Sequence, residues 1–128
     1  MLLDTHVVLW LIEDHHRLGA ETRAALAGGS PVHVSAASLW ELAIKAETGK
    51  LDVPDDLPEL VAAAGLVWLP ITAEHVWTVR QPSGLTHRDP FDALLVAQAR
   101  VEAAELVTAD QAILAAAPDG VRLRDARN

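Results

Sequence analysis

The sequence contains no cysteine, which excludes disulfide bonds, thiolate metal sites and cysteine nucleophiles and fits a reducing cytoplasm. Basic residues are also few: 10 Lys and Arg stand against 18 Asp and Glu, which gives a formal net charge of −8. This charge has the wrong sign for a protein that holds nucleic acid by bulk electrostatics. A nucleic-acid substrate would therefore need local basic residues, bound metal ions or a partner protein.

Long apolar runs are absent as well. No stretch reaches the roughly 18 residues that a membrane span needs, and no basic segment precedes the apolar N-terminus as in a signal peptide. We therefore expect a cytoplasmic protein without a membrane segment. Hydrophobic residues make up 51% of the 128 positions and the mean hydropathy is +0.20, which argues against disorder and for one globular domain.

Four tryptophans add large apolar surfaces to this small chain: Trp10, Trp40, Trp68 and Trp77. We expect Trp10 and Trp40 in the core and Trp77 in the core or in an interface. Because the apolar content is high for the chain length, some apolar surface is expected outside the core, which favours an oligomer or a protein partner.

Short apolar strands alternate with helices along the chain. Hydrophobic spacing, caps and glycine or proline stops predict strands at 1–3, 32–34, 66–69, 105–108 and 121–123, the last at an edge, and helices at 4–12, 19–26, 36–48, 55–65, 72–79, 90–103 and 110–116. This alternation predicts an α/β fold, a sandwich with a mostly parallel central sheet. In such folds, sites form at the carboxyl ends of the strands.

Four acids stand at the ends of apolar elements or inside them. Asp4 and Asp110 follow predicted strands, Glu41 lies within Leu-Trp-Glu-Leu, and Asp92 lies in the first turn of an apolar helix. Each has an ordinary explanation as well: Asp4 and Asp110 as helix caps, Glu41 as the partner of Lys45, and Asp92 as a favourable charge at a helix start. Asp89 is expected to cap that last helix, because proline follows it.

The four acids together suggest one shared cation. Carboxylates brought close to one another repel, which raises their pKa values, and a divalent ion removes that repulsion. Because every donor in the set is an oxygen, Mg²⁺ or Mn²⁺ suits the site better than zinc.

The chain resembles the PIN-domain family, and more narrowly the VapC-type toxins of bacterial toxin–antitoxin pairs. The matching segments are Leu2-Leu3-Asp4-Thr5-His6, Ser38 to Lys45 with Gly49-Lys50-Leu51, His87-Arg88-Asp89-Pro90-Phe91-Asp92 with Leu95 to Ala99, and Leu106-Val107-Thr108-Ala109-Asp110. In order and spacing they span nearly the whole chain, and the third segment is the most specific. The resemblance implies that residues 1–128 form a single PIN-like domain, a three-layer α/β/α sandwich.

The resemblance also implies a Mg²⁺- or Mn²⁺-dependent endoribonuclease. It carries the catalytic acids onto Asp4, Glu41, Asp92 and Asp110, of which Asp4 and Asp92 are the expected main metal ligands. Candidate substrate contacts in the matching segments are Thr5, Lys45, His87, Arg88 and Thr108. Ala93 and Ala109 stand where many relatives carry arginine, which removes two possible RNA contacts. The family further implies an RNA substrate, a cognate antitoxin that covers the acidic site, and a homodimer.

Several alternatives stay open at this point. A structure-specific DNA nuclease is the nearest rival, since other PIN relatives cut DNA flaps; the absence of an added domain favours the toxin. A non-catalytic module that binds RNA or protein is the rival from another class, and the intact set of four acids argues against it. A haloacid-type phosphatase would need an acid where His6 stands, and a receiver domain would need a lysine after Lys50, so both fit poorly.

Overall fold

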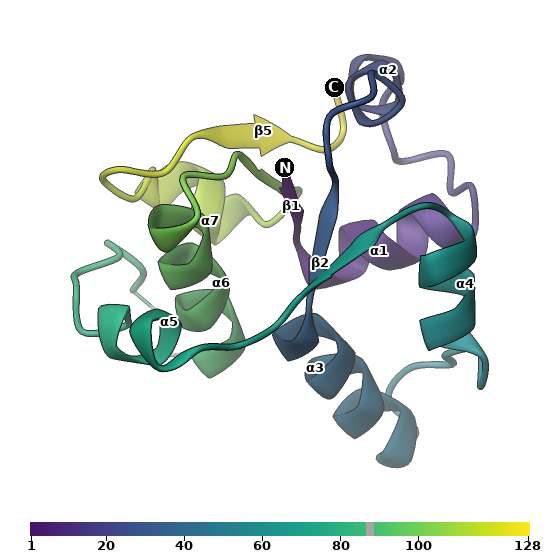
Figure 1. The fold of residues 1–128 in the computed structure, drawn as a ribbon, viewed down its shortest axis with the longest axis horizontal. Coiled ribbons are helices and arrows are strands. Elements are labelled where there is room, and N and C mark those ends of the chain that lie inside the picture. Colours follow the sequence, from purple (N-terminus) through teal and green to yellow (C-terminus); the bar gives the residue numbers. More distant parts are fainter. Residues whose placement is uncertain (87–88) are drawn as a thin grey trace.

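One parallel sheet forms the centre of the computed structural model, which describes residues 1–86 and 89–128 (Figure 1). Within these residues its strands are β1 (Leu2–Leu3), β2 (His33–Ser35), β3 (Val67–Leu69), β4 (Leu106–Thr108) and β5 (Leu123–Asp125). They are ordered β3-β2-β1-β4-β5, and all neighbours pair in parallel. Parallel neighbours need crossover connections, and the helices between the strands provide them.

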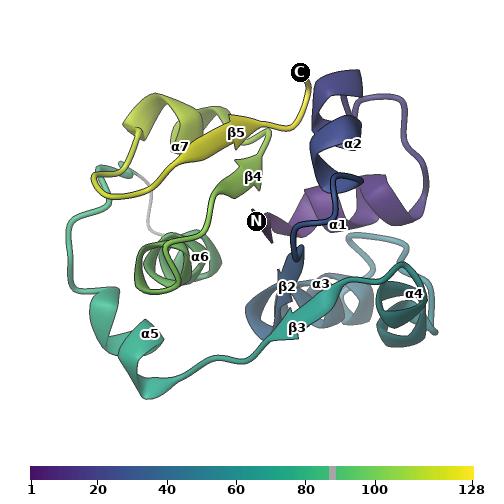
Figure 2. The ribbon, with the colours of Figure 1, turned by 45° about the horizontal axis from the view of Figure 1, so that its top comes forward.

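Helices cover both faces of this sheet. The described residues form α1 (Thr5–Ile12), α2 (Ala20–Leu26), α3 (Ala36–Glu47), α4 (Leu57–Ala63), α5 (Ala73–Thr78), α6 (Pro90–Val101) and α7 (Gln111–Ala116). Figure 2 shows α5, α6 and α7 on one side of the sheet and α1, α2, α3 and α4 on the other. The predicted three-layer α/β/α sandwich with a parallel sheet is therefore confirmed.

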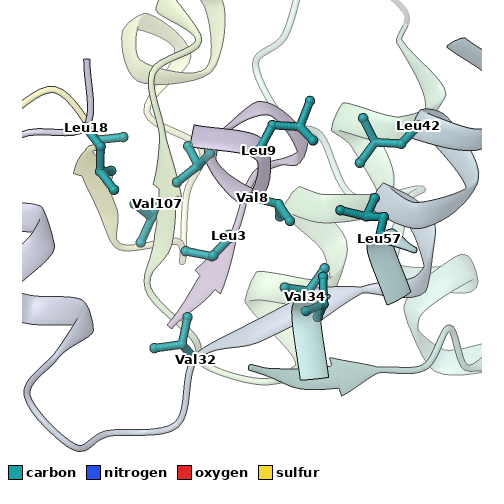
Figure 3. Close-up of a cluster of buried hydrophobic side chains, with 12 residues drawn as sticks. Leu3, Val8, Leu9, Leu18, Val32, Val34, Leu42, Leu57 and Val107 are labelled. Atoms are coloured by element: carbon teal, nitrogen blue, oxygen red, sulfur yellow. The ribbon is translucent and has the colours of Figure 1, made fainter. Parts of the chain in front are cut away.

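The two faces of β1 separate two apolar cores, because successive side chains of a strand point to opposite faces. Leu3 packs with Val34 and Val107 of the neighbouring strands and with residues of the helical layer that contains α1 and α4 (Figure 3). Leu2 points the other way, into a cluster with Leu95 of α6 and other residues. Both side chains of the short β1 strand are fully buried, so the two cores hold it in place.

The last strand begins two residues later than the predicted 121–123. The backbone N–H of Val121 donates to the carbonyl of Pro118, and Gly120 has a φ of +77°, so the chain is still completing a turn at Val121. Pairing with β4 begins at Leu123, opposite Leu106. The apolar spacing of Val121 and Leu123 indicated a strand, but turn geometry decides where it starts. The edge position of this strand is confirmed.

A buried polar chain connects α6 to the rest of the molecule. Gln98 of α6 accepts a hydrogen bond from Ser35 at 2.5 Å, and Ser35 also caps α3 by accepting from the N–H of Ala37 at 3.0 Å. The Gln98 amide donates to Nδ1 of the buried His75, whose Nε2 lies 2.8 Å from Glu102. These contacts fix α6 against the start of α3, and both helices contribute acids to the site described next.

Candidate functional site

Acids from four separate elements line one cleft. Asp4 directly follows β1, Glu41 lies in α3, Asp92 lies in the first turn of α6, and Asp110 precedes α7. All four border the same hollow of about 160 Å³, together with Asp89 at the start of α6. Asp4 and Asp110 follow the carboxyl ends of the neighbouring strands β1 and β4, where sites form in parallel α/β folds. The structure thus brings the four predicted acids together.

Asp4 is both a helix cap and a wall of the cleft. Its Oδ1 accepts from the N–H of Thr5 at 2.7 Å, which caps α1, and its Oδ2 accepts from the hydroxyl of Thr108 at 2.6 Å. Only 3% of the residue is exposed, and this burial raises the pKa of the Asp4 carboxyl above its ordinary value, with the nearby Glu41 adding to the effect. A cation beside Asp4 would therefore favour its ionised form.

Glu41 has both carboxylate oxygens occupied. Thr5 donates its hydroxyl to Oε1 at 2.7 Å, and the ammonium of Lys45 lies 2.7 Å from Oε2. The pairing with Lys45 that the helical spacing predicted is confirmed, and this hydrogen bond raises the pKa of the Lys45 ammonium. Glu41 itself is 8% exposed and lines the cleft, whereas the side chain of Lys45 is 44% exposed.

Two helix starts place the remaining acids. Asp89 caps α6 by accepting from the N–H groups of Phe91 and Asp92 at 2.8 and 3.2 Å, as its position before proline predicted. This cap fixes the first turn of α6, where Asp92 is 8% exposed. Asp110 caps α7 in the same way, accepting from Ala112 at 2.8 Å. Capping and a role in the cleft are therefore compatible, since Asp89 and Asp110 each use Oδ1 for the cap and still line the cleft.

The donor set fits a hard divalent cation. Asp4, Glu41, Asp92 and Asp110 offer only oxygen atoms, which Mg²⁺ and Mn²⁺ prefer, and the buried carboxyl of Asp4 is costly to ionise without a positive neighbour. As the side chains lie, no three acidic or histidine groups among residues 1–86 and 89–128 are close enough to hold one ion. Glu41 is turned toward Lys45, so a bound ion would require the carboxylates to reorient.

The predicted substrate contacts have different positions. Lys45 lines the cleft, whereas the hydroxyls of Thr5 and Thr108 are buried and donate to Glu41 and Asp4. His87 and Arg88 lie outside the described residues. The two threonines thus orient carboxylates, which the sequence did not reveal, because hydroxyl partners across the sheet are invisible in a local pattern.

Two other residues are worth noting. The half-exposed ring of His6 lines the cleft, with Nδ1 3.9 Å from Asp4. Its position two residues after Asp4 was the available signal. The predicted core position of Trp40 is wrong: the residue is 57% exposed and packs edge-on against Phe91. The buried face of α3 runs through Ser38, Glu41 and Leu42, and Trp40 lies off it.

A family model described as the PIN domain matches residues 1–118. No curated protein matches the chain. Among solved structures, the fold is similar to chains in VapBC2 from Rickettsia felis bound to a DNA fragment from their promoter (TM-score 0.69, 18% identity, 96% of each chain covered). It is also similar to chains in DNA-bound VapBC from Salmonella typhimurium, with a TM-score of 0.68, 21% identity, and 97% of this chain and 96% of that chain covered. A third similar structure is a toxin–antitoxin complex from Klebsiella pneumoniae, with a TM-score of 0.62, 21% identity, and 94% of this chain and 93% of that chain covered.

Proposed function

Because the chain belongs to the PIN-domain family, we propose that it is a Mg²⁺- or Mn²⁺-dependent endoribonuclease and the toxin of a toxin–antitoxin pair. The observation that carries the proposal is the cleft in which Asp4, Glu41, Asp92 and Asp110 meet. They come from four elements that the fold brings to one end of the sheet, an arrangement that capping alone does not require. PIN domains are typically nucleases that use divalent metal ions, and this donor set suits such an ion.

In this proposal the carboxylates hold the ion and orient the reactants. Asp4 and Asp92 would be the main ligands, either directly or through water, and Glu41 and Asp110 would complete the set, with one of them orienting the attacking water. A bound Mg²⁺ supplies the acidified water and the positive charge that phosphodiester hydrolysis needs at neutral pH. Thr108 and Thr5 donate hydrogen bonds of 2.6 and 2.7 Å to Asp4 and Glu41, and each of these bonds holds one oxygen of the carboxylate.

The experiment is cleavage of end-labelled single-stranded RNA by the purified chain, free of any partner. We expect cleavage at internal positions with Mg²⁺ or Mn²⁺, and none with EDTA, because the acids need the cation to act. Single-stranded DNA and a DNA flap of matched sequence are the comparison substrates. Preferential cutting of the flap would transfer the assignment to a DNA nuclease, and tight metal-independent RNA binding without cleavage would transfer it to a binding module.

The partners belong to the same proposal. Solved structures of this fold include toxin–antitoxin complexes, which supports a cognate antitoxin that covers the acidic cleft. A homodimer is supported by exposed apolar side chains, of which Trp77 at 65% and Trp40 at 57% are the most exposed aromatic ones. We place the protein in the cytoplasm, where its RNA substrate would be found. Within the described residues, no helix has the length and apolar character to cross a membrane.

A further inference from the structure

The acid cleft contains its own positive charge. Five carboxyl groups line it, those of Asp4, Glu41, Asp89, Asp92 and Asp110. Among the residues that the structure describes, Lys45 is the one lysine or arginine in that lining. Its ammonium lies 2.7 Å from Glu41 and also interacts with the charges of Asp89 and Asp4. Lys45 therefore neutralises part of the cleft in the place where a bound cation would do the same.

Lys45 also borders two further hollows, each of which shares lining residues with the cleft. One of about 460 Å³ is lined by Phe91, Pro90, Ile44 and Lys50, among others, and one of about 390 Å³ by Trp10, His15 and Lys50, among others. The side chain of Lys45 is 44% exposed, so the ammonium has space to move from Glu41 into either hollow. Lys50 lines both hollows but not the acid cleft itself.

We propose that Lys45 is a resident counter-ion of the acid cleft, which a divalent cation displaces and thereby frees to bind a substrate phosphate. The inference rests on the proposed function, since it assigns a role in loading the same site. Both oxygens of Glu41 have partners, and the partner of Oε2 is the Lys45 ammonium, so a metal ion that binds Oε2 competes with a positive charge already there. The two cations also repel each other strongly at such short range. The released ammonium then lies beside the metal, in the hollows where a nucleic-acid backbone would pass.

An ordinary ion pair between residues four apart on a helix would behave differently. Such a pair stabilises the helix slightly and has no effect on an ion bound elsewhere. A resident counter-ion instead competes with the metal, so its removal should tighten metal binding even though it removes an interaction. The effect of removing Lys45 on the affinity for the metal therefore distinguishes a resident counter-ion from an ordinary ion pair.

The test is the affinity of the metal-free, RNA-free chain for Mn²⁺, measured by calorimetry and by the electron paramagnetic resonance signal of free Mn²⁺. Lys45→Met removes the charge and keeps most of the side-chain volume, and we expect it to bind Mn²⁺ about tenfold more tightly than the wild type. Lys45→Arg retains the charge and should bind Mn²⁺ as the wild type does. Lys50→Met is the matched control, and it should change the affinity by less than about twofold because its exposed charge is screened.

A second measurement tests the released ammonium. Binding of a 2′-O-methyl single-stranded RNA, which resists cleavage, is followed by fluorescence anisotropy with and without Mn²⁺. Mn²⁺ should strengthen binding by the wild type more than by Lys45→Met. Circular dichroism confirms folding, and Lys45→Gln replaces Lys45→Met if the latter does not fold.

The outcomes separate this inference from the proposed function. A wild type that binds no Mn²⁺ overturns both. If the wild type binds Mn²⁺ and Lys45→Met binds it equally or more weakly, the counter-ion role is wrong and the proposed nuclease stands. An equal gain from Mn²⁺ in RNA binding by the wild type and Lys45→Met overturns the second step, the transfer of the ammonium to phosphate.

Discussion

Replacing Asp92 with asparagine is expected to lower RNA cleavage by about three orders of magnitude while the protein stays folded. Asp92 lies in the first turn of α6, which Asp89 caps, so the helix start does not depend on the charge of Asp92. Asparagine has the same shape but is neutral, and a neutral amide is a poor ligand for Mg²⁺ compared with a carboxylate. The loss of a favourable charge at this partly buried helix start costs about 1 to 2 kcal/mol. Initial cleavage rates give the loss of activity, and thermal unfolding of the same preparations gives the change in stability.

Asp56→Asn is the matched control for that substitution. Asp56 is exposed and also stands at a helix start, that of α4, but it is not part of the cleft lining. Its substitution should leave the cleavage rate within about twofold of the wild type, as expected for a surface position. If a clean preparation of the Asp92→Asn protein cleaves RNA as fast as the wild type, the assignment of the cleft as the catalytic site is wrong.

Replacing Asp4 with asparagine is expected to abolish the stabilisation of the protein by Mg²⁺. An ion present at one hundred times its dissociation constant stabilises the fold that binds it by about 2.7 kcal/mol. For a chain of this size, that corresponds to a rise in melting temperature of roughly 10 °C. Because Asp4 is an expected main ligand, the Asp4→Asn protein should show a rise of less than about 2 °C. Differential scanning calorimetry with EDTA and with Mg²⁺ measures this rise for the wild type and for the Asp4→Asn protein.

Without metal, the wild type and the Asp4→Asn protein should have similar free energies of unfolding. Burial of the ionised Asp4 carboxyl disfavours the folded state, and asparagine removes that penalty. The substitution also weakens the hydrogen bond from Thr108, so the net change should stay within about 1 kcal/mol. A Mg²⁺-induced rise in the Asp4→Asn protein equal to that of the wild type would show that the ion binds elsewhere.

The fold was predictable because its local signals agree with one another. Asp89 before Pro90 predicted the start of α6, and the apolar run after it predicted a buried helix, which forms around Leu95 and Val96. The helix predicted from residue 36 begins there, and the hydroxyl of Ser35 caps it. The start of β5 was not predictable from local pattern, because the turn after Pro118 sets it. Such agreement between local preference and tertiary structure is typical of sequences that specify one fold.

The candidate site was predictable for a topological reason. Asp4 and Asp110 follow apolar segments that pair as the neighbouring strands β1 and β4, so their convergence follows from a parallel sheet. Glu41 was recognisable as an acid inside an apolar segment, and it is buried. The partners of these acids were not predictable: Thr108 is far from Asp4 in the sequence, and hydrogen bonds across the sheet leave no local pattern.

The burial of single apolar residues was less predictable than the positions of the acids. Trp40 was expected in the core because it shares helical spacing with Leu39, Ala43 and Ile44, but the buried face of α3 is narrow and Trp40 lies outside it. Hydrophobicity alone does not distinguish a core residue from an exposed one, since much of any protein surface is apolar. The exposure of Trp40, which packs against Phe91, was therefore visible only once the helix was placed.

The position of a bound Mn²⁺ ion tests the central claim, that acids from four elements share one divalent cation, most directly. Crystals of the partner-free chain soaked in Mn²⁺ would be measured at a wavelength at which manganese scatters anomalously. We predict one strong anomalous peak in the cleft between Asp4 and Asp92, with carboxylate oxygens at roughly 2.0 to 2.6 Å or one water molecule away. A well-occupied Mn²⁺ site elsewhere on the molecule, with no peak in this cleft, would contradict the account.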